Sequence, residues 1–171
     1  MKRRTCSHLI LLAVVALLGA AVYAEVQRER TFGIDPLTQI DPTAVQSVAV
    51  TCSGCKPRRF EKVGGHWQMR EPFAQAADDV AVERLAAIAR APVRLRHARG
   101  ELVADKLGLD PAYATLTLDG TLLKFGTTDA INGDRYVEVD GVIALVPDRF
   151  SARIFETPES ELASPSKAVA K

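Results

Sequence analysis

The sequence is short of several features that point to a specific biochemical class. Its 171 residues include three Cys, three His, two Met and one Trp, and aromatic residues make up 6%. Three Cys are too few for a disulfide-dense secreted scaffold, and 11 Gly and nine Pro are too few for a collagen or a low-complexity chain. The chain is long enough for one ordinary globular domain and too short for a multi-domain enzyme.

The sequence also lacks a charge excess of either sign and any familiar catalytic motif. Lys and Arg total 22 against 21 Asp and Glu, and this near balance argues against a protein that binds nucleic acid. The motifs HExxH, GxSxG, GxGxxG and the P-loop are missing from the sequence. We therefore predict no enzymatic activity and no cofactor.

The N-terminus carries the longest apolar stretch of the chain. Basic residues at positions 2–4 precede an uncharged run, residues 9–24, which ends in Val-Tyr-Ala. A basic start before such a run is typical of a membrane anchor or of an export signal. We predict a single-pass anchor in the bacterial inner membrane, with cleavage after Ala24 and secretion to the periplasm as the alternative. The positive-inside rule places the rest of the chain in the periplasm in both cases.

Changes in composition divide the chain into four segments. Residues 1–24 form the anchor or signal peptide, and residues 25–43 contain two Asp-Pro steps that are typical of an extended linker. Residues 44–155 alternate between strand-like and helix-like patterns, which predicts a single extracytoplasmic domain. Residues 156–171 have few large apolar side chains and are predicted to be a disordered tail.

The second half of the domain carries the clearest pattern of secondary structure. Residues 115–125 and 136–146 each contain two alternating strands joined by Asp-Gly. This dipeptide is a strong hairpin signal, because both residues can take the positive φ that a type I′ turn requires. The predicted fold class is therefore α+β, with antiparallel hairpins forming a meander that packs against one or two short helices.

The first half of the domain predicts two more hairpins and the main helix. Alternating residues from 45 to 69 are interrupted by turns at Ser53-Gly54 and Gly64-Gly65. Residues 77–90 have helical spacing, with Asp78 or Asp79 as the N-cap and Pro92 as the stop. Smaller predicted elements are a strand at 93–97, a turn or helix at 102–107 and a short helix at 148–155, and Trp67 is predicted to lie in the core.

Cys52-Ser-Gly-Cys55 is the one sequence pattern that suggests specific chemistry. Two Cys that flank a two-residue turn face each other, close enough for a disulfide in an oxidising compartment. We predict a local structural disulfide, and a thiol–disulfide redox pair, an unlinked dithiol and a metal site are the alternatives. Known CxxC redox pairs lie at a helix N-terminus, which stabilises the thiolate, whereas this pair closes a hairpin. A zinc site would need His66 and His97 as further ligands, and neither has a characteristic zinc-ligand spacing.

Basic side chains gather in two short stretches of the domain. Two hypotheses account for them: a surface that contacts lipid head groups or an acidic partner, which requires the fold to bring the stretches together, or two solvated strand faces. The candidate interaction residues are Lys56, Arg58, Arg59, Arg94 and Arg96.

A series of short motifs, in this order, is similar to a known family. They are Gly65-His-Trp67, Glu71-Pro72, a helix entered from Ala77-Asp78, Leu107-Gly-Leu-Asp-Pro111, Leu123-Lys-Phe-Gly126 and Asp134-Arg-Tyr-Val137. The chain resembles, over about residues 40–155, the bacterial domain-of-unknown-function family numbered 4340. Its members include single-pass extracytoplasmic proteins and auxiliary subunits of gliding-motility-type ABC transporters.

The resemblance implies an α+β domain, a membrane tether and a partner in the cell envelope, such as ABC transporter subunits. The family assigns no catalytic residues, so the resemblance implies none here. This chain departs from the family pattern in its Cys52-x-x-Cys55 turn and in having a single copy of the domain. The leading hypothesis is a non-enzymatic, membrane-anchored interaction protein. A periplasmic redox protein that uses Cys52 and Cys55, and a secreted soluble ligand-binding module, are the alternatives.

Overall fold

The computed structural model describes residues 17–20, 35–98 and 100–164. The chain divides into two units, residues 1–34 and residues 35–171. Most of the predicted anchor, residues 9–24, lies outside the described residues, and the part that is described, residues 17–20, is helical. No helix within the described residues has the length and apolar character that a membrane crossing requires.

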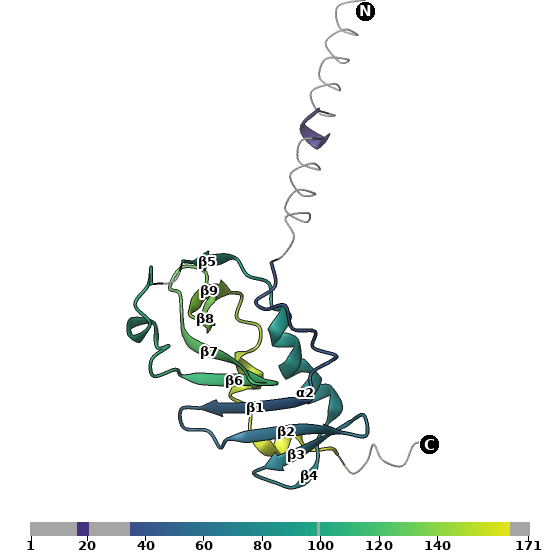
Figure 1. Ribbon diagram of the computed structural model, residues 1–171. Helices are drawn as coiled ribbons and strands as arrows, with labels where there is room; N and C mark the ends of the chain where they lie inside the picture. The colour runs from purple at the N-terminus through teal and green to yellow at the C-terminus, as the bar shows by residue number, and fades with distance from the viewer. Residues whose placement is uncertain (1–16, 21–34, 99, 165–171) are drawn as a thin grey trace, which may run out of the picture. The chain divides into compact units, whose positions relative to one another are not determined.

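The second unit is built on one nine-stranded sheet in which all neighbouring strands are antiparallel (Figure 1). The order across the sheet is β4-β3-β2-β1-β6-β7-β8-β9-β5. The strands are β1 (Ser47–Cys52), β2 (Arg58–Val63), β3 (His66–Glu71), β4 (Gln75–Ala76), β5 (Leu95–His97), β6 (Ala114–Leu118), β7 (Thr121–Thr128), β8 (Arg135–Val139) and β9 (Val142–Val146).

The predicted α+β class with antiparallel hairpins is confirmed, and the sheet is larger than the predicted meander. Strand β1 pairs with β6, with Val50 opposite Leu116, and this pairing joins the N-terminal hairpins to the C-terminal ones. The sequence contains no local signal for this pairing, because the two strands are far apart along the chain.

Both Asp-Gly hairpins form as predicted. Asp119 and Asp140 have positive φ values of 45° and 51°, as a type I′ turn requires. Asp119 also accepts hydrogen bonds from the backbone N–H groups of Gln46 and Ser47, which fixes the turn to the start of β1. The apolar residues on one face of the first hairpin are fully buried, and they are Leu116, Leu118, Leu123 and Phe125.

The predicted helix consists of α2 (Asp79–Ala86) followed by a 3-10 turn, η1 (Ala87–Arg90). Asp78 is the N-cap, and its carboxylate accepts hydrogen bonds from the N–H groups of Val80 and Ala81. Asp79 has a different role, since its carboxylate accepts a hydrogen bond of 2.7 Å from the N–H group of Trp67 on β3. Trp67 is 1% exposed, which confirms its predicted place in the core.

The remaining elements are short and connect the sheet to the helix. They are a 3-10 turn η2 (Asp105–Leu107), the helix α3 (Ser151–Ile154) and a 3-10 turn η3 (Pro158–Glu161). Helix α3 lies within the predicted helical segment 148–155. Just before it, the ring of Phe150 packs edge-on against Phe125 at 5.4 Å between centroids, which ties this segment to β7.

The folded domain extends further at both ends than residues 44–155. Leu37, in the predicted linker, is 3% exposed, and its N–H group donates to the carbonyl of Ala91. At the other end, Glu161 is 3% exposed and the N–H group of Ala163 donates to Ala76. The partners of both ends come from distant parts of the sequence, so local composition could not reveal them. The rest of the predicted linker and tail, residues 25–34 and 165–171, lies outside the described residues.

Candidate functional site

The structure does not bring the two basic stretches together. Arg58 and Arg59 lie on β2, whereas Arg94 and Arg96 lie immediately before and on β5. Five strands, β1, β6, β7, β8 and β9, separate β2 from β5 in the sheet. The candidate basic residues therefore do not form one continuous surface.

Four of the five candidate basic residues are exposed or half-buried side chains that pair with a nearby carboxylate. These ion pairs are Lys56–Glu159 at 3.8 Å, Arg59–Glu71 at 3.9 Å, Arg94–Asp134 at 2.9 Å and Arg96–Asp35 at 2.6 Å. The positive charge of these four side chains is thus balanced within the domain. This is what we expect if the two stretches are solvated strand faces and not an interaction surface.

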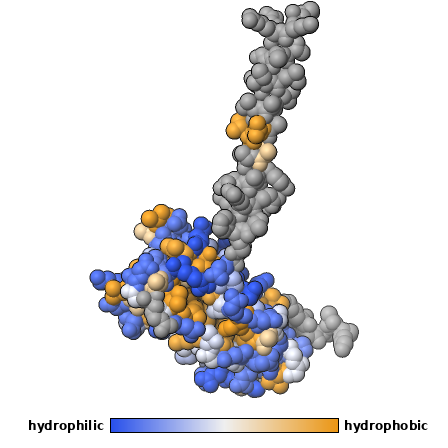
Figure 2. Space-filling model, turned by 45° about the horizontal axis from the view of Figure 1, so that its top comes forward, coloured by the Kyte–Doolittle hydropathy of each residue, from blue (hydrophilic) through white to orange (hydrophobic). Residues whose placement is uncertain are grey.

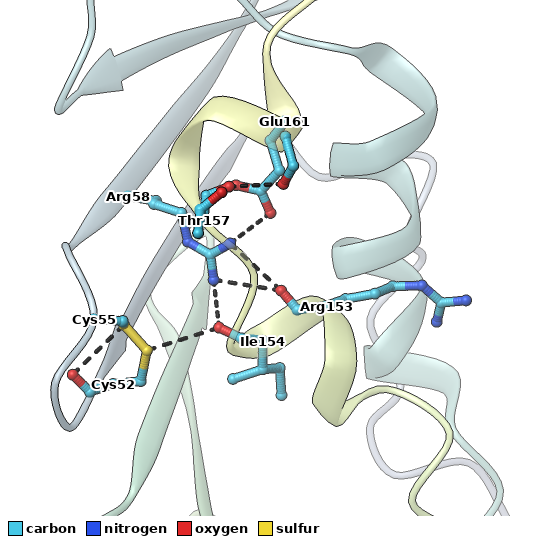
Figure 3. Close-up of polar contacts among 8 residues, drawn as sticks. Cys52, Cys55, Arg58, Arg153, Ile154, Thr157 and Glu161 are labelled. Atoms are coloured by element: carbon cyan, nitrogen blue, oxygen red, sulfur yellow. Dashed lines mark hydrogen bonds and ion pairs between the residues drawn. A yellow bond between two sulfur atoms is a disulfide. The ribbon is translucent and has the colours of Figure 1, made fainter.

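Arg58, the fifth candidate, is not a surface residue, and its assignment to an interaction surface was wrong. It is 1% exposed, and its guanidinium lies between β2 and the C-terminal segment (Figure 3). Nη1 donates to Oε1 of Glu161 at 2.7 Å, and both Nη atoms donate to the carbonyl of Arg153 at 3.4 Å. Nη2 also donates to the carbonyl of Ile154. The carbonyl of Arg153 also accepts from the N–H group of Glu156 at 3.4 Å, so Arg58 adds to the hydrogen bonds at the end of α3 and supplies the donor for Ile154.

Glu161, the partner of Arg58, is a buried carboxylate with an incomplete set of hydrogen bonds. Its Oε2 atom and the Nε atom of Arg58 have no hydrogen-bond partner in the described part of the chain. Burial raises the pKa of Glu161 to about 7, and the positive charge of Arg58 acts in the opposite direction. The carboxyl therefore takes up a proton near neutral pH, far above the range of an exposed Glu.

The cysteine pair lies beside this cluster. Cys52 and Cys55 form a disulfide that closes the turn between β1 and β2, with Cα atoms 5.3 Å apart, as predicted. The Sγ atom of Cys52 lies 3.8 Å from the carbonyl oxygen of Ile154, the same oxygen that accepts a hydrogen bond from Arg58 (Figure 3). The disulfide thus closes the turn and lies in contact with the end of α3.

The two histidines considered as metal ligands lie apart from the cysteines, each beside a carboxylate. Nδ1 of His66 is 2.7 Å from Asp79, and Nδ1 of His97 is 3.3 Å from Glu101. Within residues 17–20, 35–98 and 100–164, no group of three or more Cys, His, Asp or Glu side chains is placed to hold a metal ion.

Three other arginines, which the sequence analysis did not single out, share one surface feature. Arg84 on α2, Arg149 in the loop before α3 and Arg153 on α3 are all exposed. Their guanidinium groups form no hydrogen bond or ion pair with any residue that the structure describes. In Figure 3 the side chain of Arg153 points away from Arg58, although its carbonyl accepts from that residue.

These arginines line two adjoining hollows between α2 and the C-terminal segment. The first hollow has a volume of about 330 Å³ and is lined by Arg84, Arg153, Glu156, Ser160 and Glu161 among others. The second, about 170 Å³, is mainly apolar, with Ile88 and Phe150 in its wall and Arg149 beside them. Because Arg84 and Arg153 line both, the hollows meet at these two side chains. We call the combined feature the arginine groove.

The sequence held a weak signal for part of this groove. Arg149 and Arg153 are four residues apart around the predicted helix 148–155, a spacing that places side chains on one helical face. Their meeting with Arg84 depends on the packing of α2 against the C-terminal segment.

Exposed apolar side chains do not form a second candidate site that is as well defined as the arginine groove. On the face shown in Figure 2, hydrophobic residues lie in small groups between hydrophilic ones. Single exposed side chains such as Ile131, at 90%, are normal on a soluble surface.

Comparisons with protein families, with curated proteins and with solved structures found no match for this chain.

Proposed function

We propose that this chain is a single-pass protein of the bacterial inner membrane whose periplasmic domain binds another protein of the cell envelope and catalyses no reaction. The arginine groove is the observation that supports the binding role. Its three exposed guanidinium groups form no ion pair with a described residue, so they are available to an anionic group of a partner.

The location is supported by two features of the sequence and one of the structure. The basic N-terminus and the uncharged run 9–24 are typical of an anchor that leaves the following domain in the periplasm. The disulfide between Cys52 and Cys55 is consistent with this, since disulfides persist in oxidising compartments. The resemblance to the family numbered 4340 supports an envelope partner, with ABC transporter subunits as the class that it suggests.

The thiol–disulfide alternative receives less support from the surroundings of the cysteines. The pair closes a β-turn, and the nearest helix presents its C-terminal carbonyl, that of Ile154, to Cys52. Carbonyl oxygens at a helix C-terminus carry partial negative charge, which disfavours a thiolate. An alkylation-shift assay distinguishes the roles: a structural disulfide stays oxidised in the periplasm, whereas a redox pair cycles with added reductant and oxidant.

The experiment for the proposed function is in vivo crosslinking of a C-terminally tagged chain, followed by detergent extraction and mass spectrometry. We expect an intact N-terminus and a reproducible envelope protein whose yield falls in an Arg153→Glu chain. The matched control is Arg59→Glu, an exposed arginine on β2. A chain that begins at Glu25, or a yield that is the same in both variants, would overturn the proposal.

A further inference from the structure

We infer that the arginine groove binds an extended peptide segment in which an acidic residue lies between an apolar residue and a basic one. This inference rests on the proposed function and names the chemistry of the partner. It concerns binding alone, so it can be tested on the purified chain without reference to where the protein resides.

The centre of the groove is suited to bind a carboxylate. Arg84 and Arg153 line both hollows, and each presents a planar guanidinium that can donate two parallel hydrogen bonds to one carboxylate. The nearest acidic residue in sequence to Arg149 is Asp148, which is already engaged by Arg135 at 2.9 Å and by the hydroxyl of Ser151 at 2.6 Å. Asp78, Glu156 and Glu161 also line the first hollow, but no described carboxylate forms an ion pair with Arg84, Arg149 or Arg153.

The groove is held in shape by the buried cluster below it. Arg58 binds the carbonyls of Arg153 and Ile154, which fixes the end of α3, while the Asp148 carboxylate accepts from the N–H group of Ser151 at the start of α3. Arg153 thus projects from a short helix that is anchored at both ends. A preorganised site loses less conformational entropy when a ligand binds.

The two ends of the groove differ in chemistry. At one end Ile88, Pro92, Pro147 and Phe150 form a small apolar hollow of about 170 Å³, a suitable size for one apolar side chain. At the other end Glu156 forms no ion pair with a described residue, and Ser160 and Glu161 lie beside it. This end attracts a basic side chain, so the three parts together match an apolar–acidic–basic order.

The groove has positive arginines next to the negative Glu156, and this arrangement favours a peptide over an anionic membrane as the ligand. A lipid surface presents phosphates in every direction, and it would meet Glu156 in the same hollow as Arg84 and Arg153. Like-charge contacts of this kind oppose binding. A polypeptide can place opposite charges in succession, as the groove requires.

The test uses the purified full-length chain in detergent micelles and a synthetic library of acetylated, amidated pentapeptides. The central position is Asp, Glu, Asn, Gln or Lys, and the other positions are randomised. We expect retained peptides to carry Asp or Glu at the centre, an apolar residue on one side and Lys or Arg on the other. Replacing the central acid by its amide weakens binding about tenfold or more, since charge-assisted hydrogen bonds are lost.

Variants of the chain sharpen the result. Arg153→Glu is expected to abolish the preference for a central acid and to favour a central Lys, whereas Arg59→Glu leaves the preference unchanged. Arg84→Ala is expected to weaken acidic peptides without a new preference, and thermal unfolding confirms that each variant is folded. The inference is overturned if no peptide is retained, if central acids are not enriched, or if Arg153→Glu changes nothing.

A small phosphate ester tests the alternative that the groove binds the head groups of membrane lipids. Glycerol 3-phosphate carries the anionic group of a phospholipid head without the tails. We expect it to compete poorly with the acidic peptides, because it has neither the apolar nor the basic neighbour. If it displaces them efficiently and its binding is lost in Arg153→Glu, the groove recognises phosphate and the peptide inference fails. A mislocalised chain that still selects acidic peptides would contradict the proposed function and leave this inference standing.

Discussion

Two sets of arginines in this domain have opposite surroundings. Arg58 is buried, binds Glu161 and satisfies two backbone carbonyls, whereas Arg84, Arg149 and Arg153 are exposed and have no partner among the described residues. The same functional group therefore holds the fold together in one place and is available to a ligand in the other. The charge count of a segment does not separate these roles, but burial and pairing do.

The largest effect is expected from breaking the buried pair. Glu161→Ala removes the carboxyl that accepts from Nη1 and leaves the Arg58 guanidinium buried without this partner, and we expect a loss of about 3–5 kcal/mol in the free energy of unfolding. Urea unfolding measures it. The double change Arg58→Met with Glu161→Leu should recover part of the loss, because no unpaired charge is left, although the carbonyl of Ile154 then lacks the Arg58 donor. A double variant as unstable as the single one would contradict a charge-based explanation.

The same pair predicts a dependence of stability on pH. The pKa of Glu161 is raised from 4.5 to about 7, so the folded chain holds this proton more tightly than the unfolded chain does. The stability that this group contributes is complete below pH 4.5 and is lost as the pH rises through about 7. We expect the wild type to lose stability relative to Glu161→Gln over this range, in urea unfolding at matched pH values. A constant difference between the two proteins would show that the carboxyl does not titrate there.

Removing the disulfide is expected to have a smaller effect on the free energy of unfolding. The loop between Cys52 and Cys55 is short, so removing the bond by a double change to Ser should cost about 2 kcal/mol by loop entropy. The reduced wild type is the control and should match the double variant in urea unfolding. A much larger loss would mean that the sulfurs also support the contact with Ile154.

The smallest effect on stability is expected in the arginine groove. Arg153→Ala should change the free energy of unfolding by about 0.5 kcal/mol or less, since its guanidinium has no partner among the described residues to lose. The measurement is the same urea titration used for Glu161→Ala. A destabilisation comparable to that of Glu161→Ala would show that Arg153 belongs to the structural set and would remove the contrast between the two regions.

The hairpins and the main helix were predictable because their signals are local. Asp119-Gly120 and Asp140-Gly141 require positive φ, and the N-cap at Asp78 together with apolar residues at helical spacing defines α2. The Cys52–Cys55 pair was predictable for the same reason, since only a two-residue turn separates the cysteines.

The candidate site was predictable only in part, because its contacts are long-range. Arg58 looked like one more member of an exposed basic stretch, and its partner Glu161 lies 103 residues further along the chain. Glu161 in turn belonged to a segment whose composition resembles a disordered tail. Nothing near either residue in sequence indicates that one satisfies the other.

The sequence by itself determined the α+β class, the hairpins, the main helix and the cysteine pair, since turn geometry, capping and apolar periodicity act over a few residues. Only the tertiary structure decided which charges are buried and which are exposed. That outcome depends on how the C-terminal segment packs against β2 and α2, and burying a charge is tolerated only where a partner from elsewhere in the chain is present. Glu161 supplies this partner for Arg58, and no described residue supplies one for Arg84, Arg149 or Arg153.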